Sequence, residues 1–286
     1  MPPPSFSGAP RQSRPARSIS HYACPANMKL EGFLDRVAGS GFDSVGLTAR
    51  AFTEMPVAEI AAALQSRGLG VSSVNSAGYF LFADTAVQAR QTAENERLIA
   101  SAATLGANGL NIIAGGIGDM PMTDARQRAT AGLHRLAEQA RTADVTLLVE
   151  PVHPAAIHDK GCFSTIAQVA DAIAGIDNAR MTIDLFHSWW DPGLDAALFD
   201  PAARIGLVQF CDVAVDDAGF ALARALPGHG KVDITRALRQ TIGAHPDVPL
   251  ELELFAERFT DYDFDRVLET AGSAVDRAAR CQGNTT

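Results

Sequence analysis

Short apolar runs and amphipathic segments alternate along most of the chain. The apolar runs span four or five residues, and several are almost continuous, as is typical of parallel strands that are buried on both faces. Between the runs, apolar residues recur at spacings of three and four, as at Leu30, Phe33, Leu34 and Val37, which predicts helices that pack one face on a sheet. The predicted strands are Ser18–Tyr22, Ser44–Leu47, Gly70–Val74, Gly109–Ile113, Thr146–Val149, Met181–Asp184, Gly206–Phe210 and Leu250–Leu254.

Eight strands, each followed by a helical segment, predict an α/β fold of the (β/α)8 barrel type. The series ends with an amphipathic helix that carries Phe264, Val267, Leu268 and Ala271. A doubly wound open sheet is the competing fold, but it needs a glycine-rich turn after the first strand, and residues 22–25 read Tyr-Ala-Cys-Pro. Because a barrel closes a single sheet, we expect one catalytic domain over residues 18–286.

The N-terminal residues 1–17 differ from the rest, with five prolines, three arginines and no acidic residue. Such a segment buries little apolar surface and holds no helix, which predicts a flexible tail. An organelle transit segment is the alternative, but the prolines would break the amphipathic helix that such segments need.

Composition and charge narrow the functional classes. Of the 286 residues, 47% are hydrophobic and 20% are charged, as in globular proteins, and the net charge of -9 has the wrong sign for a nucleic-acid partner. No apolar stretch reaches the roughly 18 residues of a membrane span, so we expect no membrane partner. The four cysteines form no CxxC pair, which argues against a zinc knuckle or a disulfide framework and favours the cytoplasm.

Polar side chains end four consecutive predicted strands in the second half of the chain. The fifth to eighth strands end at Glu150, Asp184, Gln209 and Glu253. Each of them alone could cap a helix or pair with an Arg or Lys, but in a barrel all four would meet at the rim that carries the active site. Three carboxylates there would repel one another unless a cation lay between them. Oxygen ligands without a thiolate favour Mn2+ or Mg2+, and Co2+ is compatible with the same set.

Five segments together resemble the xylose isomerase-like barrel family of sugar phosphate isomerases and epimerases. That family includes hydroxypyruvate isomerases, ketose 3-epimerases, inosose dehydratases and class II AP endonucleases. The segments are residues 150–154 (EPVHP), 184–192 (DLFHSWWDP), 209–212 (QFCD), 227–234 (PGHGKVDI) and 251–255 (ELELF).

The resemblance implies roles for particular residues. Glu150, Asp184, Gln209 and Glu253 would bind one divalent metal ion, and Glu150 and Glu253 would double as the acid/base pair. His187 matches a family histidine that contacts a substrate oxygen beside the metal. Many members have His in the third ligand position, whereas this chain has Gln209, as do hydroxypyruvate isomerases.

The chemistry of such a site is coherent without an organic cofactor. A cation that chelates the carbonyl and neighbouring hydroxyl of a ketose acidifies the C–H bond between them and stabilises the enediolate. One glutamate removes the proton. Return of a proton to the opposite face inverts the carbon, and return to the adjacent carbon isomerises the sugar, and the sequence leaves both outcomes open.

Further residues are candidates for substrate binding, each with a structural alternative. His153 and Lys160 follow the fifth strand, and Lys160 aligns with a basic residue that the family often has; either could be an ordinary loop residue. Trp189 and Trp190 could stack on a sugar face or pack under their loop. Glu251 points to the same side of its strand as Glu253, so either glutamate could be the ligand, with Glu253 favoured.

We therefore expect a divalent-metal-dependent isomerase or epimerase of a small ketose or related hydroxy-carbonyl compound. A lyase that dehydrates a keto-sugar or keto-inositol is the alternative, because the same enediolate can expel a hydroxyl group. An AP endonuclease is disfavoured by the negative charge and the few histidines, and a non-catalytic sugar-binding subunit is the remaining class. The expected partner is a small carbohydrate, and a homo-oligomer is possible because barrels of this kind often associate.

Overall fold

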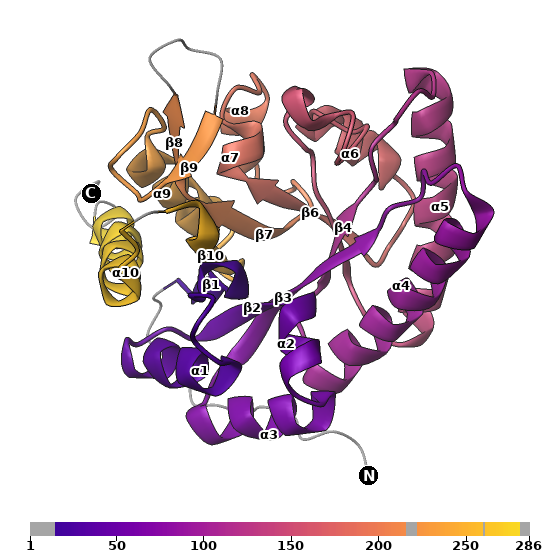
Figure 1. The fold of residues 1–286 in the computed structure, drawn as a ribbon. Helices are drawn as coiled ribbons and strands as arrows, with labels where there is room; N and C mark the ends of the chain where they lie inside the picture. Colours follow the sequence, from indigo (N-terminus) through magenta and orange to yellow (C-terminus); the bar gives the residue numbers. More distant parts are fainter. Residues whose placement is uncertain (1–14, 216–221, 260, 281–286) are drawn as a thin grey trace.

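Eight parallel strands close into a barrel in the computed structural model, which describes residues 15–215, 222–259 and 261–280 (Figure 1). Around the barrel the order is β1-β10-β7-β6-β5-β4-β3-β2, so each strand pairs with its neighbour in the chain and β1 closes the ring against β10. The strands are β1 (Arg17–Ser20), β2 (Ser44–Thr48), β3 (Gly70–Gly78), β4 (Leu110–Ile113), β5 (Leu147–Val149), β6 (Ala179–Asp184), β7 (Ile205–Phe210) and β10 (Leu250–Leu252). The prediction of one (β/α)8 barrel domain is confirmed.

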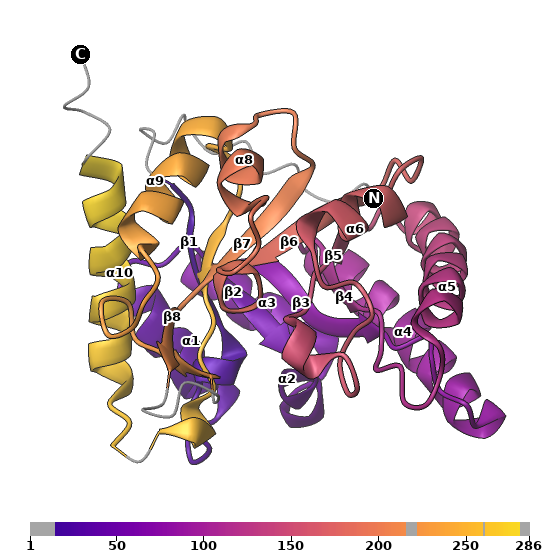
Figure 2. The same cartoon turned by 90° about the horizontal axis from the view of Figure 1, so that it is seen from above.

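Helices surround the barrel on its outside, as Figures 1 and 2 show. They are α1 (Leu30–Gly39), α2 (Ala49–Glu54), α3 (Val57–Arg67), α4 (Thr85–Leu105), α5 (Met122–Thr142), α6 (Ile166–Ala172), α7 (Leu185–Ser188), α8 (Leu194–Phe199), α9 (Ile234–Ala244) and α10 (Phe264–Arg280). The predicted apolar face of α1 is buried, and so is that of α10. Burial of these faces against the strands is the main favourable term that holds the helices in place.

The sequence did not predict the short antiparallel hairpin of β8 (Asp212–Val215) and β9 (Leu222–Ala225), which follows β7 (Figure 1). Asp212 anchors this region, because its carboxylate accepts backbone N–H bonds from Val213, Gly228 and Val232 at 2.9–3.0 Å. The turn at residues 227–232 is therefore tied to the end of β7. Strand β3 is also longer than predicted and continues past Val74 to Gly78.

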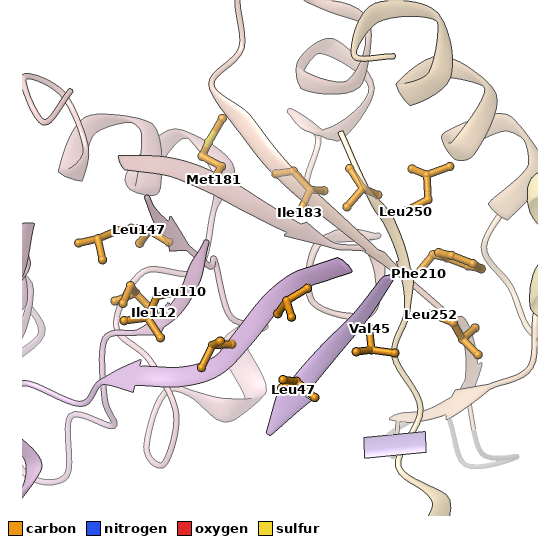
Figure 3. Packing of buried hydrophobic residues seen from close by; sticks show 14 of the residues in the cluster. Val45, Leu47, Leu110, Ile112, Leu147, Met181, Ile183, Phe210, Leu250 and Leu252 are labelled. Carbon is orange, nitrogen blue, oxygen red and sulfur yellow. The ribbon is translucent and has the colours of Figure 1, made fainter. Parts of the chain in front are cut away.

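Apolar side chains of the strands form the core (Figure 3). Val45, Leu47, Leu110, Leu147 and Phe210 have no exposed surface. Polar residues nevertheless occupy part of the barrel interior, since Ser18, Ser73, Thr182, Gln209 and Glu251 are equally buried. These polar residues surround the base of the site described below.

The predicted tail falls largely outside the described residues, which begin at Pro15, and Arg17 is already the first residue of β1. Cys24, Cys162 and Cys211 are buried free thiols, and Cys281 lies outside the described part of the chain. No helix in the described ranges is both long enough and apolar enough to span a bilayer.

Candidate metal and acid-base site

The polar strand ends meet at the carboxyl rim of the barrel, as predicted for a barrel of parallel strands. Asp184 ends β6 and is in register with Gln209 on β7, which is in register with Glu251 on β10. Glu150 directly follows β5. Glu150, Asp184, Gln209 and Glu253 are each at most 5% exposed, so four polar groups share a nearly dry environment.

A cavity of about 80 Å³ opens beside this cluster. Both glutamates predicted as the acid/base pair, Glu150 and Glu253, line it. Its wall also combines aromatic rings with amide and hydroxyl groups. The remaining lining residues are Tyr22, Asn75, Ser76, Tyr79, Asn111, Ile113, Val152, Lys160, His187, Arg224 and Phe255.

Arg224 on β9 supplies the positive charge of the site. Its guanidinium forms ion pairs with both Asp184 and Glu253, at 2.9 Å from Glu253 Oε2. The same group lies over the rings of Phe186 and Phe255, at 4.5 and 5.1 Å from their centroids. Only 6% of the Arg224 side chain is exposed, so the ion pairs act in a medium that screens them weakly.

Glu150 is held from below by a chain of hydrogen bonds that starts on β6. Thr182 Oγ1 donates to Asn111 Oδ1 at 2.6 Å, and Asn111 Nδ2 donates to Glu150 Oε2 at 2.6 Å. Because the amide of Asn111 is engaged at both ends, it cannot turn without losing a bond. Glu150 Oε1 remains free of this chain and lies 3.7 Å from His187 Nε2.

The three carboxylates differ in their affinity for protons. Burial raises the pKa of Glu150 to about 8, helped by the nearby charge of Asp184 and opposed by the Asn111 bond. Burial also raises the pKa of Glu253 well above its ordinary value, although Arg224 opposes the rise. Burial would act likewise on Asp184, but the Arg224 guanidinium reverses the effect and holds the pKa of Asp184 below its usual range. Without a bound cation, the charge of Arg224 thus balances that of Asp184, while burial favours the protonated form of both glutamates.

His187 faces the cluster with a defined tautomer. The backbone N–H of His153 donates to His187 Nδ1 at 3.2 Å, so the proton of the neutral ring lies on Nε2. Burial lowers the pKa of His187 to about 4, which keeps the ring neutral at pH 7. Nε2 lies 3.7 Å from Glu150 Oε1 and 3.9 Å from Asp184 Oδ2. His187 therefore presents an N–H donor to the cavity, which suits an oxygen atom of a bound molecule.

Glu251 lies below the site and does not line the cavity. Its carboxylate accepts hydrogen bonds from the hydroxyl groups of Ser72 and Ser73 and from Gln209 Nε2. Glu253, two residues further along, lines the cavity and pairs with Arg224. Of the two glutamates that the sequence left open, Glu253 is the one that lines the cavity, and its role as a metal ligand stays a prediction.

The residues present fit a divalent cation. The carbonyl oxygen of Gln209 is buried and has no hydrogen-bond partner among the described residues, which is costly unless something else binds it. Atoms of Glu150, Asp184 and His187 that could bind a metal lie within 4.8 Å of one another. Apart from the ring nitrogen of His187, the donors at the rim are oxygen atoms, and the nearest thiol, Cys211, is protonated because burial raises its pKa to about 12. Such a donor set favours hard cations.

The other predicted substrate-binding residues lie at different distances from the cavity. Lys160 lines it, although its side chain is largely exposed. His153 contacts His187 through its backbone, and its ring meets the ring of Trp190 edge-on at 5.7 Å. Trp190 Nε1 donates to the carbonyl oxygen of His187, and neither Trp189 nor Trp190 lines the cavity. A role in substrate binding stays a prediction for all four residues.

Sequence reasoning missed Arg224 and Asn111. Asn111 interrupts the apolar run Gly109–Ile113, and a polar residue inside a buried strand is a signal for the barrel interior. Asn75 directly follows the predicted strand Gly70–Val74, so the test for polar strand ends would have found it in the first half of the chain. Arg224 gave no comparable signal, because it lies on a hairpin that was not predicted.

Comparison with protein families settles the relationship that this geometry suggests. The model of the xylose isomerase-like TIM barrel family matches residues 34–279. The chain belongs to this family. Within the family, it is similar to an L-ribulose 3-epimerase of Mesorhizobium japonicum (strain LMG 29417 / CECT 9101 / MAFF 303099), with 26% identity over 254 residues that cover 85% of this chain and 82% of that protein.

Solved structures of this fold superpose along nearly the whole chain. The IOLI protein with a bound zinc atom has a TM-score of 0.79 at 16% identity, covering 93% of this chain and 98% of its own. A structure of L-ribulose 3-epimerase has a TM-score of 0.76 at 22% identity, covering 93% and 96%. At these identities the structures establish the xylose isomerase-like fold.

Proposed function

We propose that the protein is a divalent-metal-dependent epimerase of a small ketose, with Glu150 and Glu253 as the proton-transferring pair. The observation that carries the proposal is the placement of these two glutamates on one cavity, beside a cluster of buried ligand atoms that fits a cation. The similarity to an L-ribulose 3-epimerase supports a ketose as substrate and epimerisation as the reaction.

Glu150, Asp184, Gln209 and Glu253 would hold the metal ion. When bound, a divalent ion polarises the substrate carbonyl and makes the neighbouring C–H bond more acidic. The zinc atom in the structure of the IOLI protein, which has the same fold, supports a divalent metal in this chain. The oxygen-rich donors favour Mn2+ or Mg2+ here, with Co2+ as a compatible ion.

The residues of this chain divide the remaining work. Asn111 fixes the orientation of Glu150, so one carboxylate oxygen stays directed away from the hydrogen-bond chain and is available as a base. Glu253, which directly follows β10, would return a proton to the other face of the carbon. The Nε2 proton of His187 would bind a substrate oxygen, and the raised pKa values of Glu150 and Glu253 suit groups that must both accept and donate protons near neutral pH.

The charge of the cavity supports a substrate without a phosphate group. Among the described residues that line the cavity, the permanent cations are Arg224 and Lys160. Arg224 is already paired with two carboxylates, and Lys160 is largely exposed. A phosphoryl group would bring about two negative charges close to three buried carboxyl groups and would disfavour their ionised forms.

Proton exchange in deuterated water tests the proposal. The protein would be incubated with Mn2+ and ketopentoses or ketohexoses, beginning with L-ribulose, and the products followed by NMR. We expect deuterium at C3 and inversion of that carbon. Exchange with transfer of the carbonyl would indicate an isomerase, and loss of water would indicate the lyase alternative.

Glu150→Gln and Glu253→Gln should each lower the rate of exchange by at least about 100-fold if the residue acts as a base or acid. Glu138→Gln on α5 is the matched control, because Glu138 is exposed and pairs only locally with Arg141, and it should keep full activity. Full exchange in either site variant would contradict the assigned role. Absence of exchange with every ketose, with metal bound, would contradict the proposed activity.

A further inference from the structure

Glu251 has no place in the proposed reaction, and yet its carboxylate is as completely enclosed as that of Asp184. Its exposed fraction is 0%, and it lies on β10 directly opposite Gln209 of β7 in the strand register. Its other register partner is Ser18 on β1. A buried carboxylate at the centre of a barrel is unfavourable unless its oxygens are fully hydrogen-bonded.

Three side chains among the described residues donate hydrogen bonds to Glu251. Ser72 and Ser73 donate their hydroxyl protons to it, and Gln209 Nε2 donates to Oε1 at 2.8 Å. Because Ser72 gives its one proton to Glu251, it must accept from Ser18, with which it also forms a hydrogen bond. Asn75 Nδ2 in turn donates to Ser73 Oγ at 2.8 Å. Two strands thus hold the carboxylate in one orientation.

This fixed carboxylate determines the orientation of the Gln209 amide. The two ends of a glutamine amide have nearly the same shape, so packing alone does not distinguish them. If the amide were reversed, its oxygen would face Glu251 Oε1 at 2.8 Å, and two acceptors would repel each other. The Glu251 carboxylate therefore selects the orientation in which Gln209 Nε2 faces Glu251 and Gln209 Oε1 points away from it.

The selected orientation leaves the Gln209 oxygen buried and without a hydrogen-bond partner among the described residues. We propose that Glu251 is a positioning residue, which holds Gln209 so that its carbonyl oxygen is presented to a divalent cation bound with Glu150, Asp184 and Glu253. The inference rests on the proposed function, because it assumes that Gln209 is a metal ligand. Mutation of a residue that holds a metal ligand in its orientation lowers metal affinity by about 10- to 100-fold.

A double-mutant cycle on Mn2+ binding tests this role without an activity assay. The dissociation constant for Mn2+ would be measured by the EPR signal of free Mn2+ for the wild type, Glu251→Gln, Gln209→Leu and the double variant. We expect Glu251→Gln to weaken Mn2+ binding by about 10- to 100-fold. In the Gln209→Leu background, Glu251→Gln should cause less than about a 3-fold further loss, because the two residues act as one unit.

The outcomes separate this inference from its alternatives. Equal dissociation constants in the wild type and in Glu251→Gln, with a lower midpoint of metal-free thermal unfolding, would show a purely structural role and overturn the proposal. Losses that multiply in the double variant would show a long-range effect of charge and would also overturn it. A wild type that binds no Mn2+ at all would overturn both this inference and the proposed function, whereas an unchanged Glu251→Gln variant would leave the proposed function standing.

A measurement on the wild type remains informative if Glu251→Gln does not fold. The side-chain amide protons of Gln209 can be assigned in an NMR spectrum by their absence in Gln209→Leu. We expect one of them to exchange slowly with solvent, both without metal and with saturating Mg2+, because it is bonded to a buried carboxylate. Rapid exchange of both protons in the Mg2+ form would mean that Glu251 does not hold Gln209 when the ion is present, and would overturn the proposal.

Discussion

Arg224→Met should destabilise the metal-free protein more than the substitution of an exposed charged residue does. The methionine keeps much of the apolar contact with Phe186 and Phe255 but removes the guanidinium that pairs with Asp184 and Glu253. Removal of one partner of a buried ion pair costs about 3–5 kcal/mol, because the other charge stays buried and unpaired. For a domain of this size, about 2–4 °C per kcal/mol converts that cost into a fall of about 6–20 °C in the unfolding midpoint.

The assay is thermal unfolding in the presence of a chelator, followed by circular dichroism. Arg236→Met is the matched control, because Arg236 pairs with Asp195 on the surface, where the two side chains are 49% and 55% exposed. An exposed pair of this kind contributes only about 0–1 kcal/mol. The two variants thus lose the same type of side chain from opposite environments.

The pH dependence of the loss has a definite sign. Burial alone would raise the pKa of Asp184, and Arg224 holds it below the ordinary value, so the pair stabilises the fold above that ordinary value, which is about 4. In Arg224→Met, burial acts on Asp184 unopposed and raises its pKa, so the variant takes up this proton at a higher pH than the wild type does, which relieves part of its loss of stability as the pH falls. The gap between wild type and Arg224→Met should therefore be wide at pH 8 and should narrow toward pH 4.

Saturating Mn2+ should also narrow the gap, because the ion supplies positive charge to the same carboxylates. The reasoning would be refuted if Arg224→Met lost no more stability than Arg236→Met. A gap of equal size at pH 8 and pH 4 would refute it as well, because it would show that the loss comes from packing and not from charge.

Two further predictions concern Glu150 and metal binding. Asn111→Leu removes a hydrogen bond that lowers the pKa of Glu150. The acid limb of the pH–rate profile of ketose exchange should therefore move to higher pH by about 1–2 units, and an unmoved limb would contradict the role given to Asn111. Burial raises the pKa of Glu150 to about 8 without metal, so Mn2+ must displace a proton when it binds. The affinity of the protein for Mn2+, measured by EPR, should therefore rise by up to about tenfold per pH unit between pH 6 and 8. A flat dependence would mean that Glu150 is ionised before the ion binds.

The barrel strands were predictable because each is a local pattern with a buried apolar run. Where the pattern changed, the prediction stopped early. Strand β3 continues through Asn75 and Ser76, which are polar because they line the cavity, and the apolar run ends before them at Val74. The functional rim thus interrupts the signal that defines the strand.

The metal and acid-base candidates were predictable for a related reason. A polar residue at the end of an apolar run stands out, and the barrel brings such ends together. The hydrogen bond between side chains of neighbouring barrel strands has no such signal in the sequence. Gln209 and Glu251 are 42 residues apart, and only the strand register places them side by side.

Arg224 could not be placed for a different physical reason. Strand β9 is four residues long, and Ala225 is its only buried apolar residue, so it has no apolar periodicity to identify it. Its position is set by pairing with β8 and by the backbone bonds to Asp212, which are interactions at a distance along the chain.

Arg224 lies outside the closed sheet, which has a consequence for any redesign of this protein. The guanidinium that pairs with Asp184 and Glu253 lies on the β8–β9 hairpin, which is not part of the closed barrel. The barrel strands and the residue that balances the charge of the rim therefore belong to separate parts of the chain. A chimera that kept the eight barrel strands but took its loops from another protein would lose the guanidinium together with β9. Such a graft would have to carry an arginine of its own, or Asp184 and Glu253 would be left facing each other uncompensated.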